Sequence, residues 1–122
     1  MRITILLILL LTGGNGIADD GKGNYAIWGV GNNSCFSYLK ARENNDFDAY
    51  KLYLTGYLTA YNALTPDTFR ISGTMDMDGI IEWIDNYCKS KQLDGFLGAI
   101  SAYTSENAGK RMKRPPRALH TN

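Results

Sequence analysis

Residues 77–88 read MDGIIEWIDNYC, and the spacing of the apolar residues in this stretch decides the fold class. They recur at intervals of three and four residues, which is the period of one face of an α-helix. They are Met77, Ile80, Ile81, Ile84, Tyr87 and Cys88, with Trp83 at the edge of the same face. We therefore expect an amphipathic helix that begins at Asp76 or Asp78. Its acidic residues Asp78, Glu82 and Asp85 are predicted to face water.

Three further segments carry a helical pattern. A short one follows Ser34, a residue type that caps helix N-termini, over the sequence SCFSYLKAR. The longest covers residues 45–64, where one arc at helical pitch holds Phe47, Tyr50, Leu54, Tyr57, Leu58, Tyr61 and Leu64. A last helix is expected over residues 93–104, with Leu93, Phe96, Leu97, Ile100 and Tyr103 on one stripe. Because no strand-like alternation of comparable length occurs, the sequence predicts an all-α, single-domain bundle of about four helices.

The long helix also has a smoother side, formed by Leu52, Gly56 and Ala63. A glycine inside a helix costs about 1 kcal/mol relative to alanine. Gly56 therefore suggests that another helix approaches closely there, and that the long helix is covered on more than one side. Residues 19–33 are rich in Gly and Asn, and we expect the aromatic residues of this lead-in, Trp28 among them, to fold back on the core.

The first 18 residues have the layout of a secretory signal peptide. Arg2 precedes an apolar run from Ile3 to Leu11, and small residues at Gly16 and Ala18 suit a cleavage site. The run is too short for the roughly 20 residues that a membrane-spanning helix needs. We therefore expect cleavage near Ala18, a periplasmic or secreted protein, and no membrane span after cleavage.

Charge is unevenly distributed along the rest of the chain. Residues 19–109 hold seven basic and 12 acidic side chains, a net of −5, and are expected to form the helical domain. Residues 110–122 hold five basic side chains and no acidic one. Such a tail can attract acidic or phosphate-rich partners. Because Pro115 and Pro116 interrupt it and it has no apolar period, we expect a solvated, disordered tail, and no nucleic-acid partner.

The chain has two cysteines, Cys35 and Cys88, for which three roles can be compared. A metal site needs more ligands, and the one histidine, His120, lies in the tail. Redox catalysis favours a C-x-x-C spacing, which is absent. A structural disulfide suits two cysteines in a small exported domain, and both lie on the apolar faces of their helices. We therefore expect a bridge between the first and third helices, with a contribution of about 4 kcal/mol in the chain-entropy model.

Side chains that support catalysis are missing from residues 19–109. The sequence DMDG at residues 76–79 resembles the start of an EF-hand loop, but the twelfth position is Tyr87 where the loop needs Glu. There is no histidine for a Ser/His/Asp triad and no Gly-rich phosphate-binding loop. We therefore expect no enzyme activity, no metal and no cofactor.

Several motifs together resemble the HdeA/HdeB family of small periplasmic acid-stress proteins. They are a tryptophan before NSCFSYLKA, an aromatic helix that contains glycine, the stretch DGIIEWIDNYC and a final helix with phenylalanine. The resemblance covers about residues 28–104 and places Cys35 and Cys88 at the positions of that family's single disulfide. The weaker matches are Trp28, Leu39, Gly56 and Phe96. Loop 65–75 and the basic tail have no clear counterpart in the family.

The resemblance implies an all-α fold and acid-activated holdase chaperone activity. Near pH 2 the carboxylates are mostly protonated, so the chain after Ala18 carries about 13 positive charges. Repulsion between them loosens the domain and exposes apolar side chains to unfolding client proteins. The side chains that we expect to form this surface are Tyr50, Leu54, Tyr57, Tyr61, Trp83 and Phe96.

A second interpretation belongs to a different functional class. Small exported helical proteins similar to the Tai-type immunity proteins of type VI secretion block one cognate partner. Its contact surface would be the tyrosine-rich helix or loop 65–75, which carries Phe69 and Arg70. A helical module for a small apolar ligand is a third possibility, and a homodimer is also compatible with the sequence.

Overall fold

The computed structural model describes residues 19–117 and contains four α-helices. They are α1 (Cys35–Glu43), α2 (Asp48–Leu64), α3 (Met77–Ser90) and α4 (Phe96–Asn107), with 3₁₀ turns η1 (Gly29–Asn32) and η2 (Ala108–Lys110). Within these residues the only β-type pairings are isolated bridges. The predicted all-α fold with four helices is therefore confirmed. The predicted signal peptide, residues 1–18, lies outside the described residues.

Two side-chain caps fix where α1 and α3 begin. Ser34 Oγ accepts a hydrogen bond from the amide of Ser37, as its position in the sequence predicts. Asp76 Oδ1 accepts from the amide of Gly79, so Asp76 caps α3. Asp78 lies in the first turn of α3, where a negative charge is favourable near the helix N-terminus.

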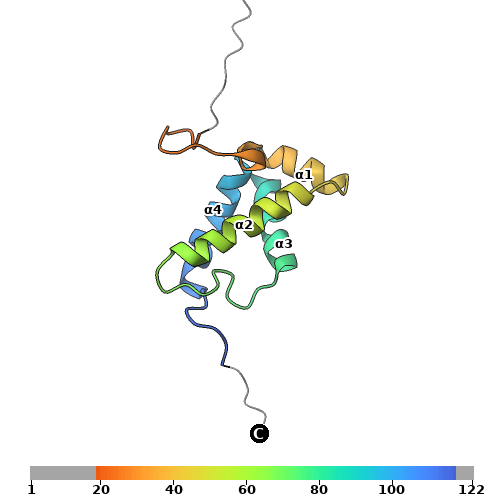
Figure 1. Ribbon diagram of the computed structural model, residues 1–122. Helices are drawn as coiled ribbons and strands as arrows, with labels where there is room; N and C mark the ends of the chain where they lie inside the picture. The colour runs from red at the N-terminus through yellow and green to blue at the C-terminus, as the bar shows by residue number, and fades with distance from the viewer. Residues whose placement is uncertain (1–18, 118–122) are drawn as a thin grey trace, which may run out of the picture.

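The buried disulfide between Cys35 and Cys88 joins α1 to α3 and confirms the predicted pairing. Figure 1 shows α2 crossing in front of α3 and α4, with α1 at the upper end of the molecule. The start of α1 is also bound to the segment that precedes α4. The amide of Cys35 donates to the carbonyl of Asp94 at 2.7 Å, and the amide of Phe96 donates to the carbonyl of Asn33 at 2.7 Å. The beginnings of α1 and α4 are therefore held together beside the disulfide.

Aromatic side chains fill the space between α2 and the other helices. The ring of Phe96 stacks on Tyr38 with centroids 4.9 Å apart, and Tyr50 of α2 meets Phe96 edge-on at 5.0 Å. Ile84 and Tyr103 are fully buried and extend the core between α3 and α4. Tyr50 of α2 is therefore a core residue, since burial of such rings dominates core energetics.

The structure corrects three expectations about exposure. Leu93 is 96% exposed, because α4 begins three residues later at Phe96. No helix covers Gly56, and a side-chain atom added there would find open space within 4 Å. Leu52, on the same side of α2, is 72% exposed, so this side of the helix is not covered as predicted.

Hydrogen bonding extends slightly beyond the predicted end of the domain. Met112 forms a bridge with Arg70, and its carbonyl accepts from the amides of Phe69 and Arg70 at 2.8 and 3.0 Å. These contacts lie two residues after residue 110, where the sequence predicts that the tail begins. Within residues 19–117, no helix is long and apolar enough to cross a bilayer.

Candidate functional site

An apolar groove of about 510 Å³ lies between residues 25–28 and α2. Its walls are formed by the lead-in, by one side of α2 and by one residue of α4. The lining residues are Tyr25, Ala26, Ile27, Trp28, Leu52, Tyr53, Gly56, Tyr57 and Leu97. None of these side chains carries a charge at neutral pH. The groove therefore suits an apolar surface rather than an ionic ligand.

Two glycines shape the groove. Gly31 is buried in η1, and a side chain there would collide with the ring of Tyr53. Because Gly31 has no side chain, the Tyr53 ring can lie against η1. Burial there raises the pKa of the Tyr53 hydroxyl above its usual value. Gly56 leaves open space on the α2 side of the groove. Tyr53 therefore forms an uncharged wall that is held in place by the backbone of the lead-in.

The groove also exposes a large aromatic side chain that we expected to be buried. Trp28 is 81% exposed, so the expectation that it folds back on the core is wrong. The physical reason is the next residue, Gly29, whose φ of +63° turns the chain into η1. This turn brings Val30 against the core and leaves Trp28 on the surface.

The outer face of α2 continues this surface without charge. Exposed residues on this face are Leu52, Gly56, Thr59, Ala60, Ala63 and Leu64. A surface helix usually carries charged or polar residues opposite its buried face, and α2 has no charged residue after Lys51. An exposed apolar face next to an apolar groove is typical of an interaction surface.

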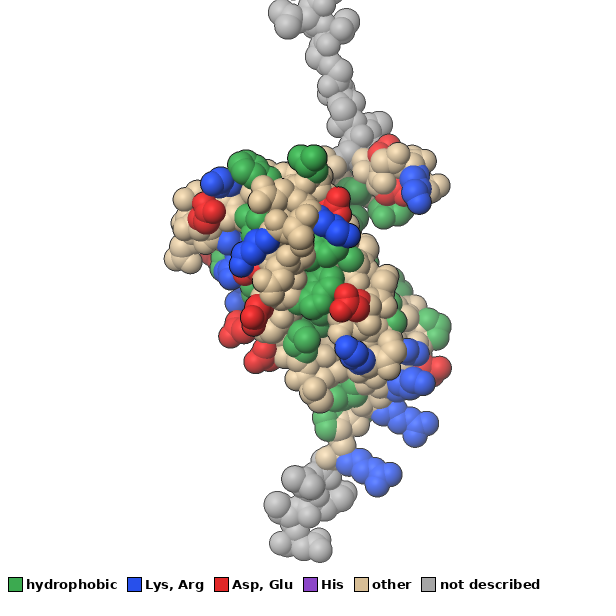
Figure 2. All heavy atoms as spheres, turned by 180° about the vertical axis from the view of Figure 1, so that it is seen from behind, with side chains coloured by type: hydrophobic (Ala, Val, Ile, Leu, Met, Phe, Trp, Pro, Cys, Tyr) green, Lys and Arg blue, Asp and Glu red, His purple; other side chains and the backbone are tan. Residues whose placement is uncertain are grey.

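The residues predicted to bind clients are divided between the core and the surface. Tyr50, Leu54 and Phe96 are buried, and they would contact a partner only if the domain opened. Tyr57 is half-buried and lines the groove, and Tyr61 is half-buried and stacks on Tyr57 outside the groove lining. Trp83 is half-buried away from the groove, where its ring stacks on Tyr87 at 5.6 Å. Figure 2 shows a separate band of hydrophobic side chains in the middle of the face seen from behind.

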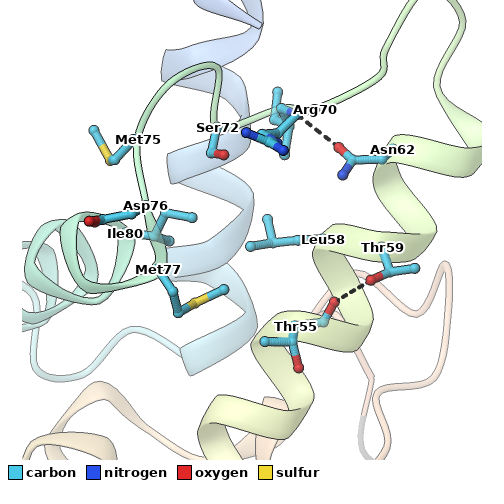
Figure 3. A pocket seen from close by; sticks show the side chains of 11 residues that line it. Thr55, Leu58, Thr59, Asn62, Arg70, Ser72, Met75, Asp76, Met77 and Ile80 are labelled. Carbon is cyan, nitrogen blue, oxygen red and sulfur yellow. Dashed lines mark hydrogen bonds between the residues drawn. The ribbon is translucent and has the colours of Figure 1, made fainter. Parts of the chain in front are cut away.

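A second pocket, of about 370 Å³, lies between α2, the segment that follows it and the start of α3 (Figure 3). Its polar groups are largely occupied by contacts within the protein. Asn62 Oδ1 accepts from the amide of Ile71 at 2.8 Å, and Thr59 Oγ1 donates to the carbonyl of Thr55 at 2.8 Å. Asn62 therefore holds loop 65–75 against α2, and the residues of this pocket serve mainly to keep the loop in place.

Asp85 lies between α1 and α3 rather than in water, which corrects the sequence-based expectation. Its Oδ1 accepts from the Tyr38 hydroxyl at 2.7 Å, and its Oδ2 lies 2.9 Å from Nη2 of Arg42. The Asp85 side chain is 17% exposed. Burial and the bond to Asp85 raise the pKa of Tyr38. The bond to Asp85 also raises the pKa of Arg42, against the opposing effect of partial burial.

A second carboxylate also accepts from a tyrosine. Asp94 Oδ2 lies 2.7 Å from the hydroxyl of Tyr87, which raises the pKa of Tyr87 to about 12, with partial burial adding to the effect. Asp94 lies in the segment between α3 and α4. Asp85 and Asp94 are therefore two acidic groups whose ionised forms accept hydrogen bonds between separate parts of the chain.

Comparisons of the chain with protein-family models, with curated proteins and with solved structures found no match. Among residues 19–117, no group of three or more His, Cys, Asp or Glu residues is arranged to hold a metal ion. The features that bear on function are therefore the groove, the outer face of α2 and the partly buried carboxylate of Asp85.

Proposed function

We propose that this chain is a small exported helical protein that binds other proteins through the groove beside Trp28 and Leu52. The observation that carries the proposal is a preformed, uncharged groove with two large apolar side chains exposed at it. The role is binding rather than catalysis. The disulfide supports export, because such bonds persist in oxidising compartments.

We further propose that acid enlarges this binding surface, as in a holdase chaperone. Protonation of Asp85 removes the negative charge that pairs with Arg42 and weakens the hydrogen bond from Tyr38. At the same pH the basic side chains remain charged and repel one another. The rings of Tyr50 and Phe96, which pack against each other between α2 and the other helices, then become accessible to unfolding proteins.

The disulfide limits how far this opening can proceed. Cys35 and Cys88 keep α1 and α3 linked at any pH under oxidising conditions. The contacts of α2, by contrast, depend on packing and on hydrogen bonds such as that from Asn33 Nδ2 to the Tyr50 hydroxyl. We therefore expect α2 to move away from a linked pair formed by α1 and α3.

The proposal is tested by light scattering of an acid-denatured client protein at pH 2.5 and at pH 7. The unaltered protein is expected to suppress scattering at pH 2.5 and to have little effect at pH 7. The double variant Trp28→Ser, Leu52→Ser should suppress it less. Leu93→Ser is the control, because Leu93 is also an exposed leucine but lies outside the groove. Failure of the unaltered protein at pH 2.5 would contradict the chaperone role.

A second candidate function is inhibition of one cognate partner, as in an immunity protein. The observation that favours it is that the groove is open in the folded domain, before any acid-induced change. This function predicts binding of one native protein at pH 7, with loss in the Trp28→Ser, Leu52→Ser variant and retention in Leu93→Ser. Broad suppression of aggregation that requires acid would instead favour the chaperone.

A further inference from the structure

Six basic side chains belong to the segments at one end of the molecule, where loop 65–75 meets the end of the described chain. They are Arg70, Lys110, Arg111, Lys113, Arg114 and Arg117. Figure 2 shows basic side chains gathered near this lower end. The two salt bridges among residues 19–117 involve none of the six. The guanidinium of Arg111 donates to the carbonyls of Asp67 and Ala108 rather than to a carboxylate.

Backbone hydrogen bonds position the start of this basic segment. Met112 is paired with Arg70 in both directions, since its amide donates to the Arg70 carbonyl at 2.9 Å and its carbonyl accepts in return. The side chain of Arg111 adds a contact to Asp67. Arg111 and Met112 are therefore held beside loop 65–75, and the basic residues Lys113, Arg114 and Arg117 follow directly from this fixed point.

Exposed apolar side chains lie on the same segments. Leu64, the last residue of α2, is 82% exposed, and Phe69 is exposed on the loop that pairs with Met112. The guanidinium of Arg70 lies over the Phe69 ring, 5.8 Å from its centroid. This end of the molecule therefore combines basic side chains that form no salt bridge within the described residues with two exposed apolar side chains, which could be buried in an apolar environment.

We propose that this end docks on the anionic surface of a phospholipid bilayer. Basic side chains near such a surface are attracted by its negative potential, and neighbouring apolar side chains gain by burial below the headgroups. Leu64 and Phe69 favour a membrane over a purely ionic partner, because duplex DNA offers these two side chains no apolar region in which to be buried. Apart from Arg70, residues 19–109 hold six basic and 12 acidic side chains, a net of −6. An anionic surface repels this part of the domain, and the basic end is therefore oriented toward the membrane.

The test is co-sedimentation at pH 7 with vesicles of phosphatidylglycerol and phosphatidylcholine in equal amounts. The protein used is the exported form, with its mass checked against residues 19–122. Binding to these vesicles and not to pure phosphatidylcholine vesicles is expected. The variant Lys113→Gln, Arg114→Gln, Arg117→Gln should bind roughly a hundredfold more weakly, at about fivefold for each basic residue.

The matched control is Lys22→Gln, Lys51→Gln, Lys89→Gln, which removes the same charge from exposed positions elsewhere. It should bind within about twofold to threefold of the unaltered protein if position matters and not net charge alone. In a second pair, Leu64→Ser, Phe69→Ser should weaken binding, and Leu93→Ser should not. Circular dichroism at pH 7 establishes that each variant is folded.

Three outcomes would overturn the proposal. One is equal binding to the two vesicle types, and another is equal weakening in the two triple variants. The third is absence of vesicle binding together with tight binding to duplex DNA or polyglutamate, which would assign the basic end to an ionic macromolecule. None of these measurements depends on acid or on a client protein, so the membrane proposal and the proposed function can fail separately.

Discussion

The hydroxyl of Tyr38 donates to Oδ1 of Asp85 at 2.7 Å, one helical turn from the disulfide along both α1 and α3. Tyr38 lies three residues after Cys35, and Asp85 lies three residues before Cys88. The interface between α1 and α3 thus has a covalent link, followed one helical turn away by a carboxylate that pairs with Tyr38 and Arg42.

Replacement of Asp85 by Asn should destabilise the folded domain at neutral pH. The change leaves Arg42 without its ionic partner and removes a charged acceptor from Tyr38. We expect a loss of about 1–3 kcal/mol in the free energy of unfolding at pH 7. Urea unfolding at pH 7 measures the difference.

Glu82→Gln is the control for this prediction, because Glu82 lies on the same helix and is exposed. Its effect at pH 7 should stay within about 0.5 kcal/mol. Equal destabilisation by the two substitutions would show that net charge on α3, and not the pairing of Asp85 with Arg42, controls stability.

Stability should also decrease at alkaline pH, in part because of Tyr87. Its pKa is raised to about 12 in the folded state, mainly by the hydrogen bond to Asp94, against about 10 in the unfolded chain. A raised folded-state pKa gives stability that is complete below pH 10 and is lost as pH rises through 12. Tyr87→Phe should therefore show a smaller loss of stability between pH 9 and 12 than the unaltered protein. The difference is measured by denaturant unfolding across that range.

Removal of the disulfide should cost about 4 kcal/mol in the chain-entropy model, since it closes a loop with a sequence separation of 53 residues. The variant Cys35→Ser, Cys88→Ser should unfold at lower urea concentration than the oxidised protein. Reductant should lower the midpoint of the unaltered protein and leave that of the variant unchanged. A midpoint for the oxidised protein that equals that of the variant would contradict the structural role of the bridge.

Replacement of Gly31 by Ala should disturb the wall of the groove that Tyr53 forms. The added methyl group meets the Tyr53 ring, so the ring must move or the domain must accept overpacking that costs about 1–3 kcal/mol. Gly98→Ala is the matched control, because Gly98 lies in α4 with open space around it. That substitution should stabilise the domain by about 0.5–1 kcal/mol. Thermal unfolding measures the two changes, and client binding should fall only in Gly31→Ala.

Helical periodicity was sufficient for much of the fold. Ile80, Ile84 and Cys88 are spaced so that one face must be buried, and the structure buries it. Periodicity gives the angle of a side chain around its own helix but not the residue opposite it. Asp85 was therefore expected in water, since its partner Arg42 comes from another helix 43 residues earlier.

The candidate site was harder to predict than the core. Leu52 and Gly56 mark an unusual side of the long helix in the sequence, but the sequence does not specify what lies beside it. Exposure of Trp28 depends on one backbone angle, the positive φ of Gly29, and no repeat or period encodes that angle. The groove arises where an irregular segment meets a helix, and such geometry depends on tertiary contacts.

The link between Cys35 and Cys88 also determines how the molecule would respond to mechanical force. The described chain leaves the domain at opposite ends in Figure 1, so a pull on its two ends acts along the length of the domain. Under oxidising conditions the load would pass through the sulfur–sulfur bond and bypass α2 and loop 65–75, which lie inside the closed ring. These residues would contribute no extension, although a free chain lengthens by about 3.3–3.6 Å per residue. The helix that carries the groove would thus bear no tension while the rest of the chain is stretched.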